Sequence, residues 1–133
     1  MILLDRLIAP IYERKIRPER LIMASQAAKI IGQDFRAGRV ILCGSTAMGT
    51  DGFSSDVDFC VETPRPLLWE EEEGFMVSMT RRLGREGISV GNGRGCIHFS
   101  VISRRDLENP EESFFMNYGQ HVNEHGITLW PKE

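Results

Sequence analysis

The sequence predicts an α/β fold, because short apolar segments of strand type alternate with longer segments of helix type. The strand-type segments are apolar or alternating: residues 39–43, 56–61 and 96–102. Gly38 and Gly44 bound the first, prolines follow the second, and a glycine-rich turn precedes the third. Two longer segments are of helix type. Residues 18–34 show helical spacing of apolar residues, and residues 67–85 carry acidic residues in the first half and arginines near the end, as suits a helix dipole. We therefore expect one sheet with helices covering mainly one of its faces.

The length of 133 residues fits a single domain, residues 1–133, that is large enough for a hydrophobic core. Residues 1–34 are expected to form an N-terminal helical segment, and residues 39–130 the core of the domain. The first residues are apolar, but charged side chains interrupt them after four positions. They therefore fit a short amphipathic helix at 2–15, and neither a signal peptide nor a membrane span.

Composition narrows the class of protein further. The net charge is −3, with 16 basic and 19 acidic residues, which argues against an extensive nucleic-acid-binding surface. Three cysteines, Cys43, Cys60 and Cys96, all fall in strand-type segments, and no Cys-x-x-Cys motif occurs. An odd count without a motif indicates reduced thiols in a cytoplasmic protein.

The helix expected at 67–85 has a charged surface. Acidic residues occupy positions 70–73 in its first half, and Arg81, Arg82 and Arg85 lie near its end. This arrangement complements the helix dipole and is typical of a solvated face. For the arginines, contact with a triphosphate or with a partner is the alternative.

Two further elements are expected in the second half of the chain. An Asn92-Gly93 pair between apolar runs favours a hairpin-like turn before the strand at 96–102. A last helix is expected from Asn109 to about Glu124, with Gly126 as its end.

Residues 44–58 carry the strongest chemical signal. Gly44-Ser45 is followed by ten residues and then by Asp56-Val57-Asp58. Because residues two apart on a strand point to the same face, Asp56 and Asp58 present two carboxylates side by side. Such a pair is unfavourable without a cation or proton, and Mg²⁺ is commonly held by one or two carboxylates together with substrate phosphates.

The start of this stretch suits a phosphate. Gly44 and Ser45 lie where a strand is expected to turn into a short helical segment, whose first N–H groups are free to bind an anion. The Ser45 hydroxyl adds a donor, and Gly49 allows close approach of the backbone. The alternative is a β-hairpin with a polar loop and two solvated aspartates.

This arrangement resembles the nucleotidyltransferase signature of the DNA polymerase β superfamily, particularly the single-domain minimal nucleotidyltransferases. Their pattern is Gly-Ser, about ten residues, and Asp-x-Asp. An apolar strand before Gly44, Ala47 and Gly49 within the turn, and Ser55 before Asp56 also match. Residues 124–130 look like the closing helix and strand of that family, so the resemblance spans roughly residues 39 to 130.

The resemblance implies a polymerase β-like fold with a mixed sheet flanked by helices, and transfer of NMP, most simply AMP from ATP, to a hydroxyl. Two Mg²⁺ ions, with Mn²⁺ as an alternative, would be held by Asp56 and Asp58. The nucleotide-binding residues would be Gly44, Ser45, Gly49 and Ser55. The implied protein partner is a small helical HEPN protein, the toxin of a toxin–antitoxin pair; a homodimer is the alternative.

One position departs from the family pattern. The strand at 96–102 usually brings a third carboxylate to the aspartate pair, but here it contains no acidic residue, and His98 takes that place. A catalytic His98 would be a general base or a metal ligand, since imidazole exchanges its proton near neutral pH and binds Mn²⁺ or Zn²⁺ better than Mg²⁺. One alternative is a core histidine satisfied by a backbone carbonyl, with the third group elsewhere. Another is that the chain is a catalytically lapsed nucleotide- or partner-binding module.

Overall fold

A four-stranded mixed sheet forms the centre of the computed structural model, which describes residues 16–49, 56–91, 96–113 and 116–131. The strands are β1 (Arg39–Cys43), β2 (Val57–Thr63), β3 (Ile97–Ser103) and β4 (Ile127–Trp130), in the spatial order β3-β2-β1-β4. β1 is antiparallel to both of its neighbours, whereas β2 and β3 are parallel. The mixed sheet expected from the sequence is confirmed. The segment at 2–15 lies outside the described residues.

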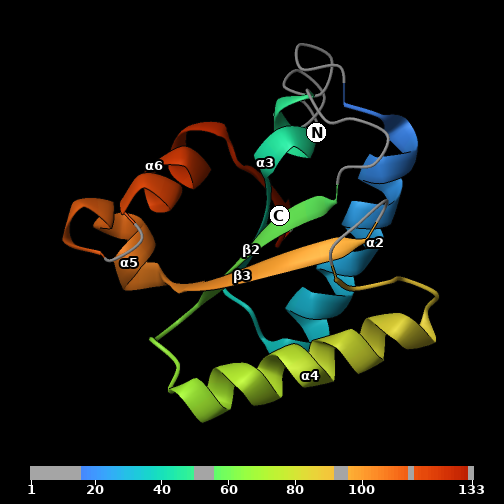
Figure 1. Cartoon of the computed structure of the whole chain (residues 1–133), viewed down its shortest axis with the longest axis horizontal. Coiled ribbons are helices and arrows are strands. Elements are labelled where there is room, and N and C mark those ends of the chain that lie inside the picture. Colours follow the sequence, from blue (N-terminus) through green and yellow to red (C-terminus); the bar gives the residue numbers. More distant parts are fainter. Residues whose placement is uncertain (1–15, 50–55, 92–95, 114–115, 132–133) are drawn as a thin grey trace.

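The larger core lies between one face of the sheet and helices α2 (Pro18–Phe35) and α4 (Trp69–Arg85) (Figure 1). Alternate strand residues such as Val57 and Phe59 point into this core and are fully buried. α2 contributes several alanines and a glycine, which allow close packing. A Cβ atom at Gly32 would overlap the indole of Trp130, so no larger residue fits there without displacing that ring.

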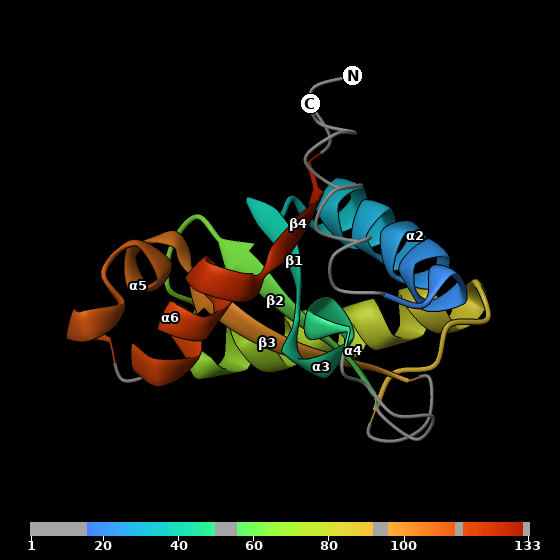
Figure 2. The ribbon, with the colours of Figure 1, turned by 90° about the horizontal axis from the view of Figure 1, so that it is seen from above.

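A smaller cluster covers part of the other face of the sheet. There Leu107 of α5 (Arg104–Glu108) and Val122 of α6 (Met116–His125) pack against strand residues. Figure 2 shows α5 and α6 close together, and a 3₁₀ turn, η1 (Pro110–Glu112), lies between them in the chain. The single helix expected from Asn109 is therefore wrong in its start, whereas its expected end before Gly126 is confirmed. The Ser103 hydroxyl caps α5 by accepting the Asp106 N–H at 3.3 Å, and Pro110 begins a separate short turn.

The hairpin expected around Asn92-Gly93 is also wrong. Val90 forms an isolated bridge with Ile97, and the bridge is parallel. The preceding residue Ile88 is 8% exposed and packs in the main core, so tertiary contacts fix the path of this segment. The Asn-Gly pair is a local signal and carries no information about those contacts. Residues 92–95 themselves lie outside the described part of the chain.

A buried carboxylate marks the far end of β2. Glu62 is 1% exposed, and its Oε2 accepts hydrogen bonds from Arg39 at 2.6 and 3.0 Å. Arg104 lies 3.6 Å from Oε1, the one buried side-chain oxygen among the described residues without a hydrogen-bond donor. A Cβ atom at Gly38 would lie 2.9 Å from Oε1. The glycine therefore makes room for this charged cluster.

Candidate functional site

The site begins where β1 turns into a one-turn helix, α3 (Gly44–Met48). Gly44 has φ = 68°, a left-handed conformation that favours glycine. A Cβ atom on it would lie 3.2 Å from both Cβ and Cγ of Asp58, which pairs with Cys43 across β1 and β2. The absence of a side chain at Gly44 therefore lets this turn lie directly against the Asp58 carboxylate.

The short helix is fixed at both ends. Gly49, with φ = 73°, closes it and donates its N–H to the Thr46 carbonyl at 3.2 Å. The Thr46 hydroxyl donates to the Asp56 carbonyl at 3.5 Å, which connects α3 to the start of β2. Ser45 is partly exposed in the first turn. Gly44, Ser45 and Gly49 thus share one turn, whereas Ser55 lies outside the described residues.

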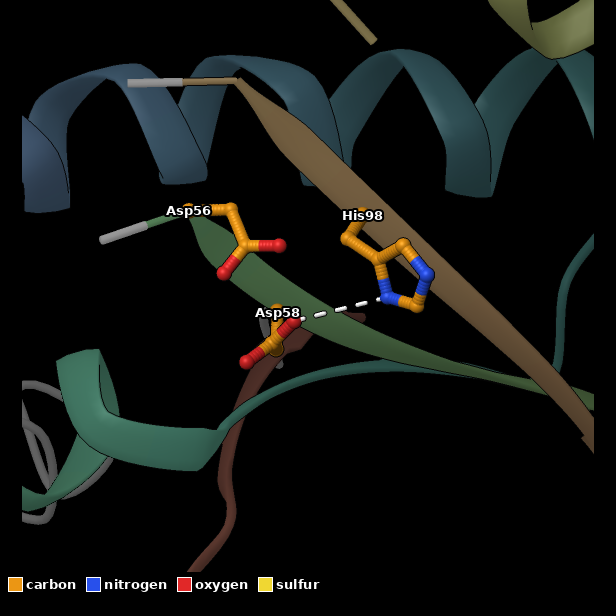
Figure 3. Close-up of side chains that lie close together, drawn as sticks. All are labelled: Asp56, Asp58 and His98. Carbon is orange, nitrogen blue, oxygen red and sulfur yellow. Dashed lines mark ion pairs between the residues drawn. The ribbon is translucent and has the colours of Figure 1, made fainter. Parts of the chain in front are cut away.

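Three side chains converge beside this turn (Figure 3). Asp56 immediately precedes β2, Asp58 lies on β2, and His98 lies opposite Asp58 in the parallel register of β2 and β3. Each offers one ligand atom, and these atoms lie within 4.8 Å of one another. His98 Nδ1 is 3.5 Å from Asp58 Oδ1. The side chain of His98 is 49% exposed, so the alternative of a core histidine is wrong.

The electrostatics of this cluster favour a bound cation. Burial and the adjacent charge of Asp56 raise the pKa of Asp58 above its ordinary value, and the contact with His98 opposes that rise. A divalent cation would remove the repulsion between the carboxylates. Two carboxylates suit Mg²⁺ or Mn²⁺, and the imidazole extends the donor set toward Mn²⁺ and Zn²⁺. The residues present therefore fit a divalent metal ion.

A group of buried thiols lies beneath the carboxylates. Cys43 Sγ lies 3.3 Å from the Tyr118 hydroxyl and donates a weak hydrogen bond to the Asp58 carbonyl at 3.5 Å. Burial raises the pKa of Cys43 to about 11 and that of Cys60 to about 12. Both thiols are therefore protonated at neutral pH and are poor metal ligands or nucleophiles. They support the site as packed, reduced residues, as the cysteine pattern predicts.

Sequence reasoning missed Tyr118, because no local motif connects it to the strand stretch at 44–58. It lies on α6 and reaches Cys43 across 75 positions of sequence. Burial and the two nearby thiols raise the pKa of its hydroxyl, so it stays protonated and acts as a hydrogen-bonding group.

Comparison with known proteins agrees with this geometry. Residues 24–85 match the model of the nucleotidyltransferase domain family, a range that contains Gly44, Asp56 and Asp58. His98 lies beyond the matched range. No curated protein matches the chain significantly. Within the described ranges, every helix is too short or too polar to cross a membrane. The glycine turn and the Asp-x-Asp strand both lie within the matched residues 24–85, so this part of the chain is similar to the nucleotidyltransferase domain family.

Proposed function

We propose that this protein transfers a nucleoside monophosphate from a nucleoside triphosphate, most simply AMP from ATP, to a hydroxyl group. The observation that supports the proposal is the convergence of Asp56, Asp58 and His98 within 4.8 Å, beside a glycine turn in the part of the chain that is similar to the nucleotidyltransferase domain family. In the reaction, the acceptor oxygen bonds to the α-phosphorus. The bond from that phosphorus to the oxygen bridging the β-phosphate breaks, and pyrophosphate leaves.

The glycine turn would hold the triphosphate. Gly44 and Ser45 lead the α3 turn, where backbone N–H groups and the Ser45 hydroxyl can donate to phosphate oxygens. Gly49 and Ser55 would complete the nucleotide-binding residues. The close contact between Gly44 and Asp58 supports this assignment, because it leaves no side chain between the turn and the carboxylate.

Asp56 and Asp58 would hold Mg²⁺, or Mn²⁺, as ligands. When bound, such ions neutralise the charge of the triphosphate and orient it for in-line attack. The raised pKa of Asp58 supports this role, because burial and the charge of Asp56 both disfavour the ionised carboxylate, which a bound cation would stabilise.

His98 would take the place of the third acidic group. As a general base, a neutral imidazole would accept the proton of the acceptor hydroxyl as that oxygen attacks. The half-exposed side chain supports this role, because an acceptor can reach it from solvent. The other role for His98 is that of a third metal ligand, for which its contact with Asp58 gives a suitable position.

The proposed acceptor is a hydroxyl of a HEPN-type protein, so that the chain would act as the antitoxin of a toxin–antitoxin pair. This part rests on the resemblance to minimal nucleotidyltransferases carried by residues 44–58. Its test is transfer of label from ATP to a HEPN protein encoded beside this chain.

The test of the chemistry is pyrophosphate release and transfer of the α-phosphate label, measured with Mg²⁺ and with Mn²⁺. A catalytic His98 requires that His98→Ala loses most of the activity and that His98→Asp keeps or improves it with Mg²⁺. His125→Ala is the matched control, because His125 contacts Glu124 and is not part of the cluster. Wild-type activity in His98→Ala would show that His98 is structural.

The second candidate function is a catalytically lapsed module that binds Mg-NTP or a partner without turnover. The observation that favours it is the absence of any acidic residue from β3 opposite Asp58. Binding of Mg-ATP without pyrophosphate release, together with activity in His98→Asp alone, would establish this function. Absence of Mg-ATP binding would instead indicate a protein-interaction role.

A further inference from the structure

The outer face of α4 is exposed along its whole length and carries a regular pattern of charge. The helix lies at the edge of the molecule, with α2 and the sheet on its inner side (Figure 1). Six exposed residues on the outer side define what we call the α4 face: Trp69, Glu70, Glu73, Val77, Arg81 and Arg85. Trp69 is 75% exposed and Val77 46%, so both apolar side chains are available for contact with another molecule.

The charged groups of the α4 face differ from those nearer the core. Arg82 pairs with Asp34 of α2 and with Glu86, and Glu71 pairs with Arg65. Within the described ranges, the four outer charges form no ion pair on their own chain. Two acids therefore occupy the first half of an open helix face, two arginines occupy its last half, and a valine lies between them.

This pattern is self-complementary when two helices run antiparallel. With Val77 of one copy against Val77 of the other, Glu73 lies opposite Arg81, since each is four positions from Val77. Trp69 lies opposite Arg85, each eight positions away. These positions are about 6 and 12 Å along the helix from the centre. Each ion pair and each cation–π contact would thus form twice, as two-fold symmetry requires.

The space around the helix permits this approach. A Cβ atom at Gly74 or Gly84 would meet no other atom within 4 Å, so both positions are open on the outside of α4. Small residues at these positions let a second helix come close. Antiparallel helices also bring opposite ends of their dipoles together.

We propose that the α4 face is the contact between two copies of this chain, with the two α4 helices antiparallel and Val77 at the two-fold axis. A partner surface of a single charge sign, such as nucleic acid, would meet repulsion along half of the face. A second copy places Arg81 opposite Glu73, and places Arg85 one helix position from the level of Glu70. Because the contact is largely ionic and limited to one helix, the dimer is expected to weaken as ionic strength rises.

The test is sedimentation of the whole chain over a range of concentrations and at two ionic strengths, about 0.01 and about 1 M, where the Debye length is about 30 and about 3 Å. Wild type is expected to dimerise at low ionic strength and to dissociate at high ionic strength. Glu70→Arg with Glu73→Arg makes the face basic, and Arg81→Glu with Arg85→Glu makes it acidic. Each variant alone is expected to dimerise at least about 100-fold more weakly.

The decisive sample is an equimolar mixture of the two charge-reversed variants. Positions 73 and 81 then carry opposite charges across the contact again, and so do the neighbouring positions 70 and 85, so the mixture is expected to form a one-to-one dimer. The control is Glu111→Arg with Glu112→Arg on η1, which changes the net charge as the basic variant does and should leave dimerisation unchanged. Circular dichroism checks that each variant is folded.

Three results would overturn the proposal: a monomeric wild type at low ionic strength, charge-reversed variants that dimerise like wild type, or a mixture that stays monomeric. A monomeric wild type would indicate that the α4 face binds a different protein. Loss of dimerisation in the η1 control as well would show that net charge, and not the α4 face, governs association.

Discussion

Replacing Asp58 by Asn should stabilise the metal-free protein and should also remove its response to divalent metal ions. Asp58 is 32% exposed, lies beside Asp56, and has a pKa raised by burial and by that neighbouring charge. The amide of Asn has nearly the same shape but no charge. The substitution therefore removes a repulsion from the folded state while leaving Gly44 free to pack against residue 58.

The size of this effect follows from the separation of the groups. At the limiting distance of 4.8 Å, two unit charges repel by about 1 kcal/mol in water and by about 3.5 kcal/mol at an effective dielectric constant of about 20. The unfolded chain keeps part of this repulsion, because the two aspartates are two residues apart. Solvent screens a further part. A net gain of about 1 kcal/mol is expected, or a rise in Tm of roughly 3–5 °C.

The assay is thermal unfolding with and without Mg²⁺ or Mn²⁺ at about pH 8, where imidazoles are mostly neutral. Without metal, Asp58→Asn should melt above wild type. A ligand that binds only the folded state stabilises it by about 2.7 kcal/mol at 100 times its Kd. Wild type should be stabilised by about this amount when the metal ion is added. Asp58→Asn should show little of this stabilisation. Glu108→Gln, an exposed acid on α5, is the control and should match wild type in both conditions.

The pH dependence has a defined sign. The raised pKa of Asp58 means that the folded state binds this proton more tightly than the unfolded chain, whose aspartates titrate near about 3.9. Ionised Asp58 destabilises the folded state. This destabilisation is absent below the unfolded pKa of about 3.9 and is complete once pH exceeds the pKa in the folded state. The advantage of Asp58→Asn should therefore shrink as pH falls. If Asp58→Asn without metal is no more stable than wild type, the proposed repulsion between the carboxylates is wrong. If metal ions stabilise the variant as much as wild type, Asp58 is not a metal ligand.

Three further substitutions test separate parts of the structure. Gly44→Ala should lower the free energy of unfolding by about 1–2 kcal/mol because of the positive φ alone. It should also weaken metal binding, because the new methyl group would displace Asp58. An unchanged melting curve and metal response would contradict the packing of Gly44 against Asp58. Ser45→Ala should weaken ATP binding by about 1.5–3 kcal/mol, measured by calorimetry, and AMP binding by less; equal losses would place the hydroxyl away from the β and γ phosphates. Glu62→Gln should cost about 2–4 kcal/mol in urea unfolding, less than a fully buried pair because Arg39 is 38% exposed, and a loss below about 0.5 kcal/mol would contradict the role of the buried carboxylate.

The parts of the site that follow from local geometry could be predicted from the sequence. Alternation along a strand places Asp56 and Asp58 on one face and Val57 and Phe59 on the other, and the structure has this arrangement. The position of His98 also follows from alternation, once a second strand lies beside the first. Its exposure did not follow, because exposure depends on which helices cover that end of the sheet.

Other features depend on contacts between distant residues. Glu62 continues the same strand face as Asp58, but its burial depends on Arg39, Arg104 and the close approach of Gly38. The separate helices α5 and α6 arise from capping by Ser103 and from Pro110, whose effects a helical apolar pattern does not resolve. The error at Asn92-Gly93 has the same origin, since a turn signal does not specify the direction of the paired segments.

The partly open position of His98 on β3 has a consequence for how this domain can change over evolutionary time. The residues on either side, Ile97 and Phe99, point into the core and hold the strand, whereas the imidazole points away from it and is half exposed. Replacement at position 98 therefore leaves the packing that holds the strand almost untouched. Drift at this position is nearly neutral for folding, so a lineage could lose, retune or recover chemistry here by single substitutions.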